Sequence, residues 1–341
     1  MFNQNDQTPF IRRIAIVGSG MAGLTAAVLL RDKGHTVRVF EKSRGPGGRM
    51  ASKRVPGGSA DIGAQYFTSR NPDFLQFLGR HAGDNTFGPW RGRFGYQTTS
   101  GRWEAFPHEE RYVGIPRMTA ITRRLSATVD VEAQTRIERL YRSGRYWSLE
   151  DNAGECHGPF DTLIVTAPPA QAEDLFNASE LPELAGELQE PVRHVHPCWA
   201  AAVHFSHLPE QPFEGMRCRN DVLDWIANNS SKPGREDAGQ WWVLHAGPQW
   251  SRAHENTPAE QVAGKMVEAF RQVTGTAETP DEVVSHRWLY AKSSTTDHPG
   301  FRWFGDHRIG LAGDWLSGGR VEGAFDSASS LVAHMLSGSL R

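Results

Sequence analysis

Residues 13–42 read RIAIVGSGMAGLTAAVLLRDKGHTVRVFEK. The stretch opens with a short apolar strand, Ile14 to Val17, that runs into a glycine-rich turn. A helix of small and apolar residues follows from Leu24 to Leu30, and a second strand, Val37 to Phe40, ends at Glu41. This order of strand, glycine turn, helix, strand and acidic residue is typical of a Rossmann unit that binds a dinucleotide.

Each glycine of the turn has its own physical task in such a unit. Gly18 allows the tight turn, Gly20 lets the backbone approach a pyrophosphate, and Gly23 lets the helix pack closely on the strand. Met21 and Ala22 lie in the turn next to the helix N-terminus, where free N–H groups and the positive dipole end favour phosphate. We therefore assign these residues to cofactor binding.

Glu41 stands where a carboxylate can accept hydrogen bonds from both hydroxyls of a ribose. Its charge would repel a 2′-phosphate, so the dinucleotide is FAD or NAD rather than NADP. The next stretch favours FAD, because Lys42 leads to paired glycines and then to Arg49, which can neutralise pyrophosphate charge. Gly48, within that pair, suits a second approach of backbone to phosphate. The alternative is a flexible basic loop, since glycine and proline also mark loops.

A second cofactor signal lies near the other end of the chain. A short apolar strand ends in Gly313-Asp314, and the aspartate can accept hydrogen bonds from the hydroxyls of a ribityl chain. A small-residue helix, Phe325 to Leu336, follows GGRVEGA at 318–324. Its N-terminus is expected at Gly323-Ala324, with Glu322 beside it, at the N1/O2 edge of a flavin. That placement would stabilise the negative charge of reduced flavin.

The chain resembles the flavin-dependent amine oxidase superfamily and, within it, the bacterial renalases. The resemblance covers nearly the whole chain, through FEKSRGPGGRMASKR (40–54), ADIGAQYFT (60–68), LDWIANNSSKP (223–233), HRWLYA (286–291) and GDWLSGGRVEGAF (313–325). It implies FAD as cofactor and an α/β fold: a Rossmann-like, doubly wound parallel sheet with an inserted α+β substrate domain on a mainly antiparallel sheet. It also implies that the backbone near Arg136 and Ile137 lies at the adenine.

We expect the FAD-binding domain to be discontinuous, comprising residues 11–75, 115–185 and 285–337. The substrate domain is then built from 76–114 and 186–284, which contain aromatic strand-like segments and a helix from about Pro258 to Val273. A fully apolar strand, Thr162 to Val165, suits a buried parallel position.

Composition excludes several other classes. At 341 residues, with 38% hydrophobic content and net charge −2, the chain gives no electrostatic reason to bind nucleic acid or an anionic membrane. It has no apolar run long enough to span a bilayer and no hydrophobic signal core, and residues 1–9 are expected to form a loose tail. The widely spaced Cys156, Cys198 and Cys218 suit a reducing cytoplasm. His204 and His207 lack a third ligand, so no metal site is expected.

Amine oxidases of this fold usually carry a lysine near flavin N5 on a substrate-domain strand. The candidate strand, Trp199 to Phe205, holds none. The renalase resemblance implies another donor, 2- or 6-dihydro-NAD(P), oxidised to NAD(P)+ by hydride transfer to N5 while O2 is reduced to H2O2. Two alternatives stay open: an amine oxidase with an unidentified amine, and a flavin-binding sensor or scaffold without turnover.

The expected pocket residues follow from the resembled segments. Gln65 and Tyr66 follow the 61–63 turn, which should cross the flavin, and both are assigned to the cofactor. Tyr66 is also assigned to catalysis, with three residues of the second half of the chain: Asn228, His245 and Trp288. A hydrogen-bonded core histidine and aromatic packing are the alternatives for the last two. Lys232-Pro233 is interpreted as a loop.

Overall fold

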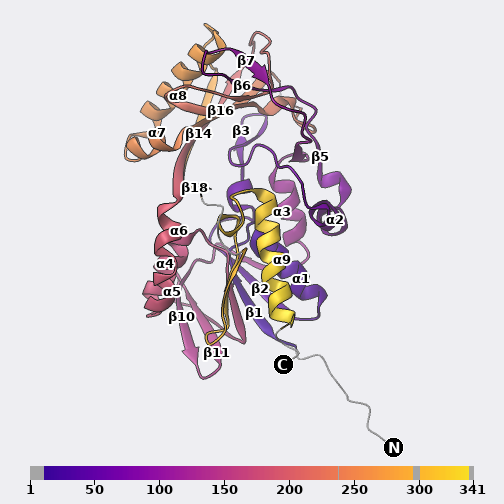
Figure 1. The fold of residues 1–341 in the computed structure, drawn as a ribbon, viewed down its shortest axis with the longest axis vertical. Helices are drawn as coiled ribbons and strands as arrows, with labels where there is room; N and C mark the ends of the chain where they lie inside the picture. The colour runs from indigo at the N-terminus through magenta and orange to yellow at the C-terminus, as the bar shows by residue number, and fades with distance from the viewer. Residues whose placement is uncertain (1–10, 237, 295–299, 338–341) are drawn as a thin grey trace, which may run out of the picture.

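The computed structural model describes residues 11–236, 238–294 and 300–337, and the expected tail at 1–9 lies outside this part. Two sheets are arranged along the long axis of the molecule (Figure 1). The first has six strands, parallel except for β19. In spatial order they are β19 (Arg302–Phe304), β20 (Ile309–Leu311), β13 (Thr162–Val165), β1 (Arg13–Val17), β2 (Thr36–Glu41) and β9 (Asp130–Ala133).

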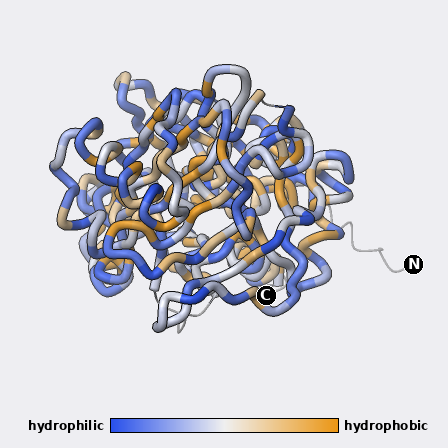
Figure 2. Tube along the Cα trace, turned by 90° about the horizontal axis from the view of Figure 1, so that it is seen from above, coloured by the Kyte–Doolittle hydropathy of each residue, from blue (hydrophilic) through white to orange (hydrophobic). Residues whose placement is uncertain are grey.

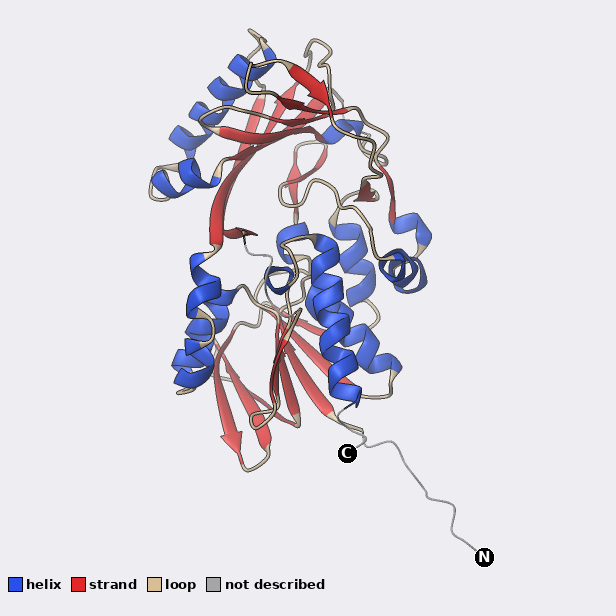
Figure 3. Ribbon diagram, viewed as in Figure 1, coloured by secondary structure: helices blue, strands red, loops and turns tan. Residues whose placement is uncertain are grey.

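Both faces of this sheet are covered. Helices α1 (Met21–Asp32) and α9 (Val321–Ser337) lie side by side on one face (Figure 3). Apolar residues of the other face pack with α4 (Pro169–Ala178) and with a three-stranded antiparallel sheet of β10 (Ile137–Ser143), β11 (Tyr146–Asp151) and β12 (Cys156–Phe160). Burial on both sides explains why β1 and β13 are almost wholly apolar.

The second sheet has seven strands, and its neighbours are antiparallel except for β15 and β6. In spatial order they are β18 (Glu282–Ser293), β14 (Val195–Phe205), β17 (Gln240–Ala246), β16 (Leu223–Asn228), β15 (Gly215–Arg217), β6 (Phe94–Gln97) and β7 (Trp103–Ala105). Helix α8 (Ala259–Thr274) packs on its outer face. The inner face packs on the hairpin of β3 (Ser52–Val55) and β4 (Gly58–Asp61).

The expected fold class is confirmed, since a parallel dinucleotide-type sheet carries an inserted, mainly antiparallel sheet. The predicted domain boundary at residue 285 falls inside β18, which pairs with β14 of the second sheet from Glu282 to Ser293. Helix α9 begins at Val321, earlier than expected. The other elements are α2 (Pro72–His81), β5 (Phe87–Pro89), β8 (Tyr112–Gly114), α3 (Thr119–Ser126), α5 (Pro182–Gly186), α6 (Gln189–Arg193) and α7 (Pro248–Ala253).

Hydrophobic segments gather toward the middle of the molecule when it is seen from above, and hydrophilic loops surround them (Figure 2). One cluster joins the two halves: Val55, Ala60 and Ile62 of the hairpin region pack on Ala200 and Val243 of the inner face. Among the described helices, none combines the length and the apolar character needed to cross a bilayer.

Candidate active site

The first glycine turn has the backbone geometry that the motif predicts. Gly18 has φ +105°, a conformation that favours glycine, and its N–H donates to Phe40 O at 2.9 Å. A Cβ on Gly23 would lie 2.0 Å from Gly18 O, so only glycine allows the helix to approach the turn this closely. A Cβ on Gly20 would meet nothing within 4 Å. Open space therefore lies at the N-terminus of α1, where Met21 and Ala22 begin the helix.

The second glycine loop lies against the first. Gly47 N–H donates to Ser19 O at 3.1 Å, and a Cβ on Gly48, which has φ +50°, would be 3.6 Å from Gly20 Cα. Two stretches of backbone without side chains thus meet beside a helix N-terminus. This arrangement suits a pyrophosphate, because N–H groups can approach it closely.

The Glu41 side chain is buried at the end of β2. Its carboxylate accepts hydrogen bonds from the backbone N–H of Ser19 at 2.9 Å and of Ser43 at 2.8 Å. Next to it, Lys42 Nζ donates to Gln171 Oε1 at 2.8 Å. Burial and the nearby Arg136 charge lower the pKa of Lys42. The carboxylate is therefore held at the turn, as a ribose-binding group must be.

Arg49 and Asp314, which the sequence singles out separately, meet in space. Arg49 Nη2 lies 2.5 Å from Asp314 Oδ1, although the two residues are 265 positions apart. Asp314 follows β20, and its backbone oxygen accepts the N–H groups of Ser317 at 2.8 Å and Gly319 at 2.8 Å. The ion pair therefore brings together the arginine predicted to bind the pyrophosphate and the aspartate predicted to bind the ribityl chain.

The N-terminal end of α9 makes contacts that the sequence did not predict. Glu322 is buried, and its Oε1 accepts the N–H groups of Arg70 at 2.5 Å and Asn71 at 2.7 Å, directly before α2. The N–H of Ala324 already donates to Arg320 O at 3.1 Å. The first-turn N–H groups that lack an acceptor inside the helix are those of residues 321–323. Gly323 is needed for packing, because its Cβ would lie 2.0 Å from Ser317 O.

The backbone of Arg136 is also engaged elsewhere. Its N–H donates to Asn152 Oδ1 at 3.0 Å, and its oxygen accepts the N–H of Asn152 at 2.9 Å. Ile137 is buried and pairs with Asp151 in the β10–β11 ladder. Both polar backbone groups of Arg136 are therefore satisfied within the protein, which leaves its exposed side chain as the group that could contact a nucleotide.

Two of the predicted catalytic side chains converge on the turn that follows β4. His245 Nε2 and Trp288 Nε1 each lie 3.1 Å from Ile62 O. Because this oxygen can only accept, Nε2 of His245 carries the proton. Burial, reinforced by the Lys292 charge, lowers the pKa of His245 to about 4, so the ring is neutral at pH 7. Tyr66 follows this turn, and its ring centroid lies 5.6 Å from that of Trp225.

Asn228, the third predicted catalytic residue of this half of the chain, does not join them. Its Oδ1 accepts the N–H of Ser231 at 3.2 Å, and its Nδ2 donates to Gln240 Oε1 at 3.4 Å. With Phe213 and Trp242 it lines a separate pocket of about 190 Å³. Trp242 belongs to the core beneath α8, so this pocket lies toward the outer side of the sheet. Successive side chains of a strand point to opposite faces of the sheet, and the Asn228 side chain points to the outer face, like that of its partner Trp242.

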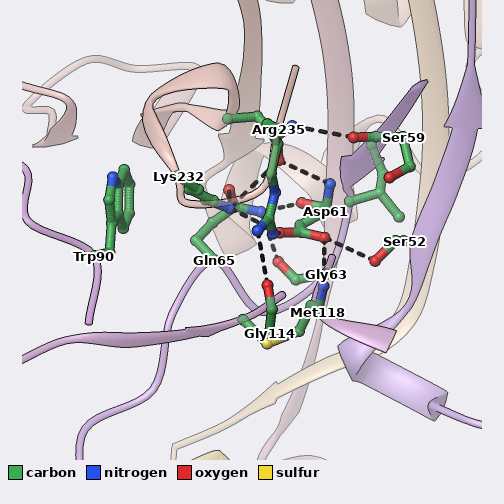
Figure 4. Close-up of polar contacts among 12 residues, drawn as sticks. Ser52, Ser59, Asp61, Gly63, Gln65, Trp90, Gly114, Met118, Lys232 and Arg235 are labelled. Carbon is green, nitrogen blue, oxygen red and sulfur yellow. Dashed lines mark hydrogen bonds and ion pairs between the residues drawn. The ribbon is translucent and has the colours of Figure 1, made fainter. Parts of the chain in front are cut away.

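Sequence reasoning missed Lys232, the most deeply buried cation of the described residues. Its side chain is 0% exposed, and Nζ lies 3.2 Å from Asp61 Oδ2, 3.1 Å from Gln65 Oε1 and 3.5 Å from Asn229 Oδ1 (Figure 4). Asp61, also 0% exposed, binds Arg235 through the same oxygen. Gln65, predicted to bind the cofactor, uses its side chain in this network. A lysine in a polar loop gave no local signal, because Asp61 lies 171 positions away.

The charges in this network perturb each other. Burial acts to raise the pKa of Asp61, but Lys232 and Arg235 outweigh it, and the pKa is lowered. Burial lowers the pKa of Lys232 to about 8, against the attraction of Asp61.

One group among the described residues has metal-ligating side chains close together: Asp151, Glu155 and His157. The Asp151 carboxylate is already used, with Oδ2 at 2.9 Å from His157 Nε2 and Oδ1 accepting the N–H groups of Ala153 and Glu155. Cys156, Cys198 and Cys218 are free thiols.

Comparison with known proteins defines the class. Residues 16–80 match the NAD(P)-binding Rossmann-like domain, and residues 98–336 match the family described as flavin containing amine oxidoreductase. The second match spans well over half of the chain, so the chain belongs to the flavin-containing amine oxidoreductase family. The cofactor of this family is FAD, and the paired glycine loops, Glu41 and the Arg49–Asp314 pair fit it.

Curated relatives match over short segments. The chain is 50% identical over 52 residues to a zeta-carotene-forming phytoene desaturase of Myxococcus xanthus, which is 15% of this chain and 10% of that protein. It is 44% identical over 66 residues to an L-amino-acid oxidase of Siganus canaliculatus, 19% of this chain and 12% of that protein. The alignments thus span about a tenth of the length of these relatives.

Solved structures match over nearly the whole chain. Cyclohexylamine oxidase from Brevibacterium oxydans has a TM-score of 0.73 at 12% identity, covering 97% of this chain and 100% of that one. Putrescine oxidase bound to putrescine has a TM-score of 0.70 at 13% identity, covering 96% and 99%. A fatty acid isomerase from P. acnes has a TM-score of 0.69 at 14% identity, covering 95% and 98%. At such low identity these likenesses establish the fold alone.

Proposed function

We propose that this chain is an FAD-dependent oxidase whose donors are dihydronicotinamide nucleotides reduced at ring position 2 or 6. The products are NAD(P)+ and, from O2, hydrogen peroxide. The free thiols and the absence of a described membrane-crossing helix support a cytoplasmic place for this reaction.

The main support is the inner face of β14. Ala200 and Ala202 occupy this face and pack against Ile62, where a substrate-domain lysine would be expected in an amine oxidase. Lys232 does not replace it, because an ammonium has three N–H donors and three acceptors lie within 3.5 Å of Nζ. No donor of this lysine is left for a water molecule or an amine.

The side chains around the turn suit the uncharged, planar dihydropyridine ring of such a donor. His245 is neutral, and Tyr66, Trp225 and Trp288 present aromatic surfaces. FAD, when bound, would supply the hydride acceptor and the route by which the two electrons reach O2. Loss of that hydride restores an aromatic pyridinium ring in the donor, so the chain needs to orient the ring and exclude water but needs no strong base. An amine would first have to lose a proton.

Anaerobic rapid mixing of the holoprotein tests this proposal. We expect fast bleaching of the flavin by 2- or 6-dihydro-NAD(P), and slow or no bleaching by ordinary 4-dihydro NADH and by a panel of primary amines. Efficient bleaching by an amine, with no response to the isomers, would make the protein an amine oxidase. A flavin that no donor bleaches would favour a sensor or scaffold.

A further inference from the structure

Lys232 is not needed to neutralise its acidic neighbour. Arg235 already pairs with Asp61 Oδ2, and its Nη1 donates to Gly114 O and Pro233 O, each at 2.7 Å. The remaining oxygen, Oδ1, accepts the hydroxyl of Ser52 at 2.7 Å and the N–H of Met118 at 2.9 Å. The carboxylate is therefore paired and hydrogen-bonded without the lysine.

Burying a second cation at this place is costly. A charge removed from water loses several kcal/mol of solvation unless strong interactions replace it. The cluster holds two cations and one carboxylate among the described residues, so one positive charge is left over. The Trp90 ring covers the ammonium at 5.2 Å, and its Nε1 donates to Ser231 Oγ at 2.9 Å, which holds the loop of Lys232 in place. Such a cost calls for a function other than pairing with Asp61.

The contact specific to Lys232 is the one with Gln65. An ammonium can only donate, so the atom of Gln65 that faces it must be the amide oxygen. The amide nitrogen is thereby directed back to the main chain, where it donates to Asp61 O and, at 3.0 Å, to Gly63 O. Ile62 lies between Asp61 and Gly63 in the chain, and its backbone oxygen accepts hydrogen bonds from His245 and Trp288. The carbonyl groups of residues 61–63 are all held by side chains.

The same turn is tied to the cofactor loop. Ala64 N–H donates to Arg49 O at 2.9 Å, and a Cβ on Gly63 would lie 2.0 Å from that oxygen. Figure 4 shows the Gln65 side chain between Lys232 and the main chain of the turn. Tyr66 comes directly after Gln65, so the turn that this amide holds leads straight into the tyrosine.

We propose that Lys232 is a positioning residue, which acts through the Gln65 amide to fix the 61–66 turn and thereby the Tyr66 ring at the reaction site. The inference rests on the proposed function only in taking Tyr66 as part of that site. Lys232 itself touches neither donor nor flavin in this account.

The test compares four variants as holoproteins: Lys232→Met, Gln65→Met, the double variant, and Lys265→Met. Lys265 lies on the outer helix α8, where Nζ is 3.1 Å from His254 Nε2, and serves as the matched control. The first readout is circular dichroism of the bound flavin in the visible region, which senses the groups around the ring and needs no donor. The second is the limiting rate of anaerobic flavin bleaching by 2- or 6-dihydro-NAD(P).

We expect Lys232→Met and Gln65→Met to change the dichroism in the same way and to lower the limiting rate at least tenfold, with FAD content unchanged. The double variant should resemble either single one, because both break the same link. Lys265→Met should behave as the unaltered protein.

Two results would overturn the inference: a Lys232→Met protein that matches Lys265→Met in both readouts, or effects of the two substitutions that simply add. If Lys232→Met does not fold, Gln65→Met decides alone, since it leaves the ions of Asp61, Lys232 and Arg235 in place. Unchanged dichroism in that variant would then disprove the link. Failure of every dihydro isomer to bleach the unaltered protein would count against the proposed function, while the dichroism would still test Lys232.

Discussion

His245 is a neutral imidazole held in the interior by one carbonyl group. Its pKa in the folded protein is about 4, below the ordinary 6.5, so between these values the unfolded chain binds a proton that the folded protein does not. Stability must therefore fall as the pH falls from about 6.5 to about 4. The loss attributable to this one residue is on the order of 3 kcal/mol.

Urea unfolding of the holoprotein at pH 7 and at pH 5 measures this effect. We expect His245→Asn, whose amide can still donate to Ile62 O, to lose less stability between these two pH values than the unaltered protein. His108→Asn, at an exposed histidine, is the control and should keep the full pH dependence. An equal pH dependence in all three proteins would show that folding does not lower the pKa of His245.

At the residue scale, sequence reasoning succeeded where a side chain serves a local motif. Glu41 and the glycines act within a single strand–turn–helix unit, so their spacing carries the information. Lys232, Gln65 and Asp61 act through bonds between distant segments, which no spacing reveals. Glu322 lies in the right segment but bonds to the start of α2, because a buried carboxylate takes the nearest free N–H groups.

At the scale of the element, the start of α1 separates packing from binding. A Cβ at position 23 would overlap Gly18 O, whereas a Cβ at position 20 would enter open space. We expect Gly23→Ala to lower the melting temperature of the apoprotein by several degrees, since a strained core position costs on the order of 1–3 kcal/mol. Gly20→Ala should leave that temperature nearly unchanged and weaken FAD binding at least tenfold.

Thermal melts of the apoproteins and fluorescence titration with FAD measure the two effects. A Gly20→Ala protein that binds FAD normally would place the pyrophosphate away from this turn. A stable Gly23→Ala apoprotein would mean that α1 can shift to make room for a methyl group.

Elements buried on both faces were the easiest to predict. β13 has the bounds expected from Thr162 and the three apolar residues after it. β1 begins one residue earlier than expected, and β2 is one residue longer than expected at each end. β16 was harder, because its pairing with β17 shifts register between Leu223 and Trp225. A shift of one residue reverses which side chains face inward, so the face on which Asn228 lies does not follow from the sequence pattern of this segment.

At the scale of the whole molecule, FAD should act as a clamp between distant parts of the chain. Because Arg49 and Asp314 belong to segments 265 positions apart, a ligand that contacts both stabilises the chain as a unit. We expect added FAD to raise the melting temperature of the apoprotein in a single transition. Arg49→Met should reduce this rise, since a tenfold weaker affinity removes about 1.4 kcal/mol of the stabilisation.

Arg124→Met, at an exposed arginine of α3, is the control and should show the full rise. Two separate transitions in the unaltered protein, of which only one responds to FAD, would contradict a shared clamp.

The Arg49–Asp314 pair also has a consequence for biosynthesis. A ribosome makes the first glycine turn long before the strand that pairs with the edge of β13, and the aspartate that meets Arg49 follows that arginine by 265 positions. Domains generally fold as units as the chain emerges, and this one is incomplete until β20 and α9 have left the exit tunnel. Until then the open edge of β13 is exposed to chaperones, proteases and neighbouring nascent chains. Capture of the vitamin-derived cofactor should therefore follow synthesis of β20 and α9, and we expect a cell short of riboflavin to degrade newly made chains before it loses mature ones.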